Sequence, residues 1–136
     1  MTKQIDLDKY TQFVDSTTSY PSKSNEEMIA RIQQLNKRDV PIARLMTAAV
    51  GMSAEAGEFT EIIKKLVFQG KELTEENRIH LLKELGDVYW YFTQAMLGLE
   101  VDLNEVVLTN VTKLSARYPD GAFDVFRSEN RADGDI

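Results

Sequence analysis

Four acidic side chains, arranged as two pairs with the same spacing, are the residues of this chain best suited to chemistry. Glu55 and Glu58 are three residues apart, and so are Glu84 and Asp87. On a helix, residues at this spacing project from the same side, one turn from each other. Four carboxylates in a partly dry groove repel one another and lose solvation, so they need a cation. Mg²⁺ prefers such oxygen ligands and keeps positions open for water and substrate phosphates.

An ordinary solvated helix face is the alternative for either pair alone, because acids three residues apart are common on helices. The repetition of the pair favours a metal site over that alternative. Glu61 continues the spacing, but it also precedes Lys65 by four residues. That separation suits an ion pair along a helix, which we favour over a role for Glu61 as a fifth ligand.

Apolar residues at helical spacing predict the two long helices that carry these acids. The first covers about residues 42–68, and Glu55 falls inside its apolar stripe, which consists of Ala48, Met52, Phe59, Ile62 and Leu66. The second covers about residues 74–99, and Glu84 and Asp87 flank its stripe, which consists of Leu81, Leu85, Val88, Phe92 and Met96. The short connection between the two helices predicts antiparallel packing, which brings the four carboxylates to one interface.

Shorter helices complete an all-α fold, an antiparallel helical bundle of about five helices. They are predicted at about residues 7–16, 24–36 and 102–118. Ser24 and Asp102 are each followed three residues later by Glu, which is the capping-box spacing. Pro21 is expected to end the first of these helices. The length predicts one domain over residues 1–123, and the polar residues 124–136 are predicted to form a loosely held C-terminal tail.

Composition excludes several other kinds of protein. The net charge of −6 argues against a nucleic-acid binder, because affinity for a phosphate backbone needs clustered Lys and Arg. The absence of cysteine excludes disulfides and thiolate metal sites. The acidic N-terminus does not look like a signal peptide, and no apolar run reaches the roughly 18 residues of a membrane-spanning helix. We therefore expect a cytoplasmic protein that does not bind membranes.

Residues 88–99 are apolar or aromatic almost all the way round a helix. Such a helix is buried on more than one side, which a small bundle does not easily provide by itself. The sequence thus predicts that oligomerisation completes the bundle, as a homodimer or a homotetramer.

The acidic motifs together resemble the MazG-type family of all-α nucleoside triphosphate pyrophosphohydrolases. The resemblance covers about residues 45–123 and rests on Glu55-Ala-Gly-Glu58, Glu84-Leu-Gly-Asp87 and Asn110-x-x-Lys113-x-x-x-Arg117-Tyr118. It implies hydrolysis of a nucleoside triphosphate to the monophosphate and pyrophosphate, with Mg²⁺ as the cofactor and Mn²⁺ as a substitute. Many members carry a second Glu where this chain has Ala54.

The resemblance also implies roles for individual residues. The implied metal ligands are Glu55, Glu58, Glu84 and Asp87, of which Glu55 and Glu58 are also the candidate catalytic residues. The implied substrate-binding residues are Asn110, Lys113, Arg117, Tyr118, Lys65 and Trp90. Without the family match, the cations would be read as solvated helix residues, and the aromatic candidates Phe13, Phe68, Trp90 and Tyr118 as core. The resemblance favours deoxynucleotides as substrates.

Two alternatives come from other classes of protein. A di-iron carboxylate bundle needs Glu-x-x-His motifs, whereas the one histidine, His80, lies four residues after Glu76 and is expected at the surface. A non-catalytic helical module, binding nucleotides or another protein, would fit the fold if a ligand were missing. All four acids are present, so we favour the enzyme.

Overall fold

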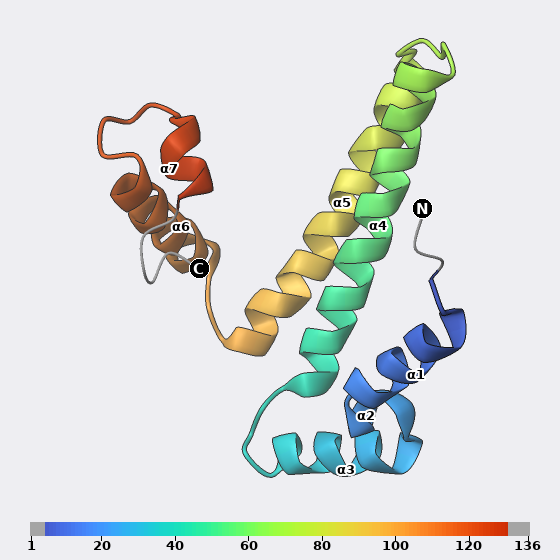
Figure 1. The fold of residues 1–136 in the computed structure, drawn as a ribbon. Helices are drawn as coiled ribbons and strands as arrows, with labels where there is room; N and C mark the ends of the chain where they lie inside the picture. The colour runs from blue at the N-terminus through green and yellow to red at the C-terminus, as the bar shows by residue number, and fades with distance from the viewer. Residues whose placement is uncertain (1–4, 131–136) are drawn as a thin grey trace. The chain divides into compact units, whose positions relative to one another are not determined.

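The computed structural model describes residues 5–130, which form helices and no strands, so the predicted all-α fold is confirmed. Figure 1 shows the helices in chain order. Their bounds are α1 Leu7–Thr17, α2 Tyr20–Lys23, α3 Asn25–Asn36, α4 Ile42–Phe68, α5 Glu75–Leu99, α6 Leu103–Arg117 and α7 Val125–Glu129. The chain divides into two compact units between Ile42 and Ala43. The assignment of residues 1–123 to one domain stays a prediction.

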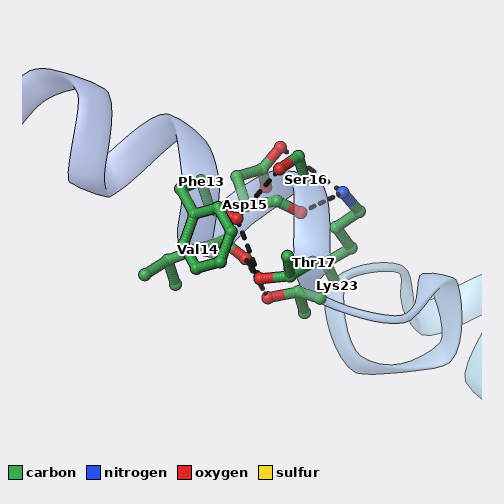
Figure 2. A network of polar contacts seen from close by, with 7 residues as sticks. Phe13, Val14, Asp15, Ser16, Thr17 and Lys23 are labelled. Carbon is green, nitrogen blue, oxygen red and sulfur yellow. Dashed lines mark hydrogen bonds and ion pairs between the residues drawn. The ribbon is translucent and has the colours of Figure 1, made fainter.

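The first unit contains α1, α2 and α3, and polar side chains fix the corner between the first two (Figure 2). The Lys23 ammonium donates to the Asp15 carbonyl at 2.8 Å and lies 3.4 Å from the Asp15 carboxylate. The Thr17 hydroxyl donates to the Phe13 carbonyl at 2.8 Å, which satisfies a carbonyl at the end of α1. The prediction that Pro21 ends α1 is wrong. Pro21 lies in the first turn of α2, where its fixed φ suits a helix start.

Side-chain caps begin α3 and α6 where the sequence predicts them. Ser24 Oγ accepts from the Glu27 backbone N–H at 3.3 Å, and Asp102 Oδ1 accepts from the Glu105 backbone N–H at 2.9 Å. The second bond of a capping box is replaced at Ser24, since its backbone N–H donates to the Tyr20 carbonyl at 3.0 Å. The Ser24 hydroxyl donates to the Glu26 carboxylate at 3.0 Å. Two hydrogen bonds to the Glu26 carboxylate lower its pKa: the first comes from the backbone N–H of Glu26 itself and the second from the Ser24 hydroxyl. One side-chain oxygen is therefore enough to start each helix.

The second unit contains α4 to α7, and its two long helices, α4 and α5, lie side by side and run in opposite directions (Figure 1). Gly70, with φ 63°, supplies the left-handed conformation that ends α4, and the Thr74 hydroxyl caps α5 by accepting from the Asn77 N–H at 3.2 Å. At the other end of the pair, the Arg44 guanidinium donates to the Gln94 side-chain oxygen at 3.1 Å. The antiparallel arrangement predicted from the short connection is thus present.

The facing stripe of α4 is the predicted one. Ala48 and Ile62 are buried, and Met52, Phe59 and Leu66 are half-buried. The stripe of α5 differs from the predicted one, because Leu85 is half exposed while Glu84 is buried, although Phe92 and Met96 are half-buried. A regular three-and-four spacing of buried and half-buried residues runs through Leu81, Glu84, Val88, Tyr91, Ala95 and Gly98. The prediction that Glu84 flanks the stripe is therefore wrong. Glu84 lies within the stripe of α5, just as Glu55 lies within the stripe of α4.

Gly51 marks a close approach of the two long helices. It is buried on α4, and a Cβ built at this position would overlap the ring of Tyr91 on α5. The Tyr91 ring consequently packs directly on the backbone of α4. By contrast, Gly57 on the same helix has nothing within 4 Å of an added Cβ.

The C-terminal residues of the described chain contain a short helix where a loosely held tail was predicted. Asp124 caps α7 by accepting from the Arg127 N–H at 2.8 Å, and the Arg127 guanidinium pairs with Asp120 at 3.0 Å. Val125–Glu129 thus form a short capped helix with no buried residue, and the loosely held tail over residues 124–136 stays a prediction. Residues 131–136 lie outside the described chain.

No helix within residues 5–130 is long and apolar enough to cross a membrane. Several apolar side chains of α5 are nevertheless more than half exposed in the single chain, and they include Tyr89, Trp90, Leu97 and Leu99. This exposure matches the pattern from which an oligomer is predicted. The oligomeric state itself stays a prediction.

The packing at Gly51 predicts opposite effects for two similar substitutions. Gly51→Ala should lower the free energy of unfolding by about 1–2 kcal/mol, because overpacking against Tyr91 outweighs the higher helix propensity of Ala. Gly57→Ala should raise it by about 0.5–1 kcal/mol, since there only the propensity changes. Urea unfolding followed by circular dichroism measures both. An equal gain in stability for the two variants would show that the Tyr91 contact does not exist.

Candidate metal centre

Three of the four predicted carboxylates meet across the α4–α5 interface. Glu55 and Glu58 come from α4 and Glu84 from α5, and one carboxylate oxygen of each lies within 4.8 Å of the others. Oxygens that share one hard cation at about 2.0–2.6 Å lie at most about 5 Å apart. These three residues, called the carboxylate trio below, are therefore spaced to hold a divalent cation.

The three residues of the trio differ in burial, from the interior to the surface. Glu84 is buried, with 5% of the residue exposed, Glu55 is half-buried, and Glu58 is exposed. The helical register causes this order, because Glu84 and Glu55 occupy stripe positions while Glu58 lies one turn from Glu55 on the rim. A cation held by all three would keep an open side toward solvent, where water and a substrate can reach it.

Desolvation and mutual repulsion of carboxylates set the electrostatics at Glu55. Desolvation of Glu55, followed by the charges of Glu58, Asp87 and Glu84, raises the pKa of Glu55 above its ordinary value. The direction is the one expected when carboxylates approach one another away from bulk water. A cation at this position would relieve the repulsion, so the donor set fits a hard metal ion such as Mg²⁺.

Asp87, the fourth predicted ligand, lies at the edge of the trio. It is exposed, and it is not among the three residues whose oxygens converge. Its charge is nevertheless close enough to contribute to the raised pKa of Glu55. The role of Asp87 as a ligand stays a prediction.

Glu61 pairs with lysines, as the sequence favours. Its carboxylate contacts Lys64 and lies 3.6 Å from Lys65 Nζ. The hydrogen bond from Lys64, followed by the charges of both lysines, lowers the pKa of Glu61. Lys65, predicted to bind substrate, thus has an acidic partner in this structure.

His80 contacts the trio, which the sequence analysis missed. It is at the surface, as expected, with 55% of its side chain exposed, but its Nε2 lies 2.9 Å from Glu84 Oε1. The four-residue separation was the available signal. Glu76 lies at the same distance on the N-terminal side of His80, and the prediction took only that residue into account.

The predicted substrate-binding residues of α6 share one helix face. Asn110, Lys113 and Arg117 follow a three-and-four spacing along the helix, and Tyr118 ends it with its ring 5.9 Å from that of Phe123. Their place beside a bound triphosphate stays a prediction.

Lys65 lines a cavity of about 450 Å³ at the closed end of the α4–α5 pair. The other polar residues of the lining include Lys71, Asn77 and His80. Trp90 lies on α5 with its ring 4.9 Å from Tyr91. The expectation that the aromatic candidates are core is wrong in the single chain for Phe13, Phe68 and Trp90, which are all more than half exposed.

Comparison with known proteins gives two matches and one negative result. The family model described as the MazG nucleotide pyrophosphohydrolase domain matches residues 45–122, which are more than half of the chain and contain all four predicted ligands. The Gene 37 protein of Mycobacterium phage L5 is 39% identical over 82 residues, 59% of this chain and 71% of the phage protein. No solved structure gives a significant match. The chain therefore belongs to the MazG nucleotide pyrophosphohydrolase family.

Proposed function

We propose that this protein is a Mg²⁺-dependent nucleoside triphosphate pyrophosphohydrolase that releases a nucleoside monophosphate and pyrophosphate. The observation that carries the proposal is the carboxylate trio, which combines residues of two antiparallel helices inside the region that matches the family. Acids on an ordinary solvated face would point away from one another. Convergence with partial burial is what a metal site requires.

The reaction needs water to attack the α-phosphorus of the substrate. When bound, Mg²⁺ neutralises phosphate charge and makes a water molecule more acidic. Glu55, Glu58 and Glu84, with Asp87 beside them, would hold the cation. Glu55 accepts the proton of the attacking water, since its half-buried position favours the protonated form. The bond between the α-phosphorus and the bridging oxygen breaks, and pyrophosphate leaves with that oxygen.

The remaining predicted residues bind the substrate in this proposal. Asn110, Lys113 and Arg117 present one donor face, on which the Arg guanidinium suits two phosphate oxygens and the Lys ammonium supplies a compact charge. The Lys65 ammonium would leave its ion pair with Glu61 and bind a phosphate oxygen instead. Tyr118 and Trp90 offer aromatic faces to the base.

We further propose a cytoplasmic homodimer or homotetramer that prefers deoxynucleotides. The exposed apolar residues of α5 support self-association. The competing function is a non-catalytic nucleotide-binding or protein-interaction module with the family fold. It is disfavoured because no member of the trio is missing and their oxygens converge.

Divalent metal should stabilise the protein through the trio. At a hundredfold excess over its dissociation constant, Mg²⁺ should raise the Tm by roughly 5–10 °C. Glu58→Gln should reduce this rise to less than about 2 °C, since it removes a ligand charge. Glu61→Gln is the matched control, one turn further along α4 and outside the trio, and should behave as the wild type. Thermal scans with Mg²⁺ and with a chelator measure the effect, and an equal response of Glu58→Gln and wild type would refute the assignment.

The raised pKa of Glu55 predicts a pH dependence in the metal-free protein. A carboxylate with a raised pKa binds more protons when folded, so stability falls as the pH rises from about 4.3 through the raised value. Glu55→Gln should lose this part of the slope. The Tm of both proteins, measured between about pH 4 and 7 with a chelator present, tests the prediction. Parallel curves would contradict it.

Turnover should require the metal and the trio together. With a panel of ribo- and deoxynucleoside triphosphates, Mg²⁺ should give monophosphate plus pyrophosphate, and Glu58→Gln should lower the rate at least about 100-fold. Glu61→Gln should retain the activity. Chromatography of the products decides between reactions: diphosphate plus orthophosphate would exclude attack at the α-phosphorus. No turnover, with Mg²⁺ still bound, would favour the non-catalytic module.

A further inference from the structure

We propose that His80 is a positioning residue, which holds the Glu84 carboxylate toward Glu55 and Glu58 and so sets the affinity of the trio for a divalent cation. The inference rests on the metal site of the proposed function and adds a residue that none of the acidic motifs contains. It stands on one contact, the 2.9 Å separation of His80 Nε2 and Glu84 Oε1.

The chemistry of the two groups indicates which of them carries the proton in this contact. An ionised carboxylate only accepts, so the proton lies on Nε2 and His80 is the donor. The Glu84 side chain is 7% exposed, which leaves little room for water to take over this role. Within residues 5–130, His80 is the side chain that the structure records as pairing with Glu84.

A fixed carboxylate is a better ligand than a free one. A Glu side chain has several rotatable bonds, and ordering them costs free energy that a partner can supply before the metal binds. The contact with His80 is at Oε1, which leaves the other carboxylate oxygen of Glu84 for a cation. Polar partners that orient metal ligands in this way commonly change metal affinity by about 10–100-fold when removed.

Imidazole suits this position better than a permanent cation. Lys or Arg would also donate to Glu84, but its positive charge would oppose the entry of a metal ion into the same site. A neutral imidazole donates from one nitrogen without adding charge. His80 therefore can fix the geometry of Glu84 while leaving the negative charge of the trio available to the metal.

The location of His80 makes the role testable without disturbing the core. Its side chain is 55% exposed and lines the cavity at the closed end of the α4–α5 pair, one helical turn before Glu84. Substitution there removes no buried apolar group. Metal affinity can thus be changed separately from folding.

Two replacements of similar length separate the polar contact from the bulk of the side chain. His80→Gln keeps an N–H donor, whereas His80→Met does not. The probe is Mn²⁺, whose free concentration is followed by electron paramagnetic resonance during titration of the full chain. The dissociation constant should rise about tenfold or more in His80→Met and stay within about threefold of wild type in His80→Gln. Thermal scans with a chelator should give the same Tm for all three proteins.

Each other outcome overturns the proposal in an identifiable way. Unchanged binding in His80→Met would show that Glu84 needs no positioning, while the metal site stands. Equal weakening in both variants would show that the N–H donor is not responsible. Failure of the wild type to bind Mn²⁺ would remove the metal site, and with it the proposed function.

Discussion

The interface between α4 and α5 carries negative charge where a helix pair ordinarily packs apolar side chains, and most of the site's properties follow from that placement. Glu84 is buried and Glu55 half-buried between positions such as Ala48 and Ile62. Carboxylates in such surroundings lose hydration, which raises the pKa of Glu55 and leaves a demand for positive charge. The fold tolerates this demand because the apolar stripe continues on both sides of the acids. It also explains why one polar contact from His80 carries weight.

Much of the fold could be predicted because periodic apolar residues and capping residues mark its long helices in the sequence. The bounds of α4 agree with the prediction, and α5, α3 and α6 begin after the capping residues Thr74, Ser24 and Asp102. The short helices α2 and α7 could not be found in this way. Contacts of single polar side chains, such as Lys23 with Asp15, hold them in place, and those contacts leave no period in the sequence.

The residues of the candidate site could be predicted, but the burial of each residue could not. Equal spacing of the two acid pairs brought Glu55, Glu58 and Glu84 to one place, but the same spacing ranked Asp87 with them although it lies at the edge. Apolar residues surround α5 on several sides, so periodicity did not distinguish Leu85 from Glu84 as the inward residue. For His80, Glu76 and Glu84 both lie four residues away, and only burial of Glu84 in the folded chain selects between them.

The contact of Gly51 with Tyr91 fixes the distance between α4 and α5 independently of the acids. An aromatic ring lying on helix backbone resists compression, and the bond from Arg44 to Gln94 fastens the same end of the pair. Further along, the connection through Gly70 closes the other end. The trio therefore sits midway along a span whose two ends are held. In the proposed metal site, the distance between the oxygens of the two helices is therefore fixed by packing at Tyr91, and this distance limits the size of the ion that the site accepts.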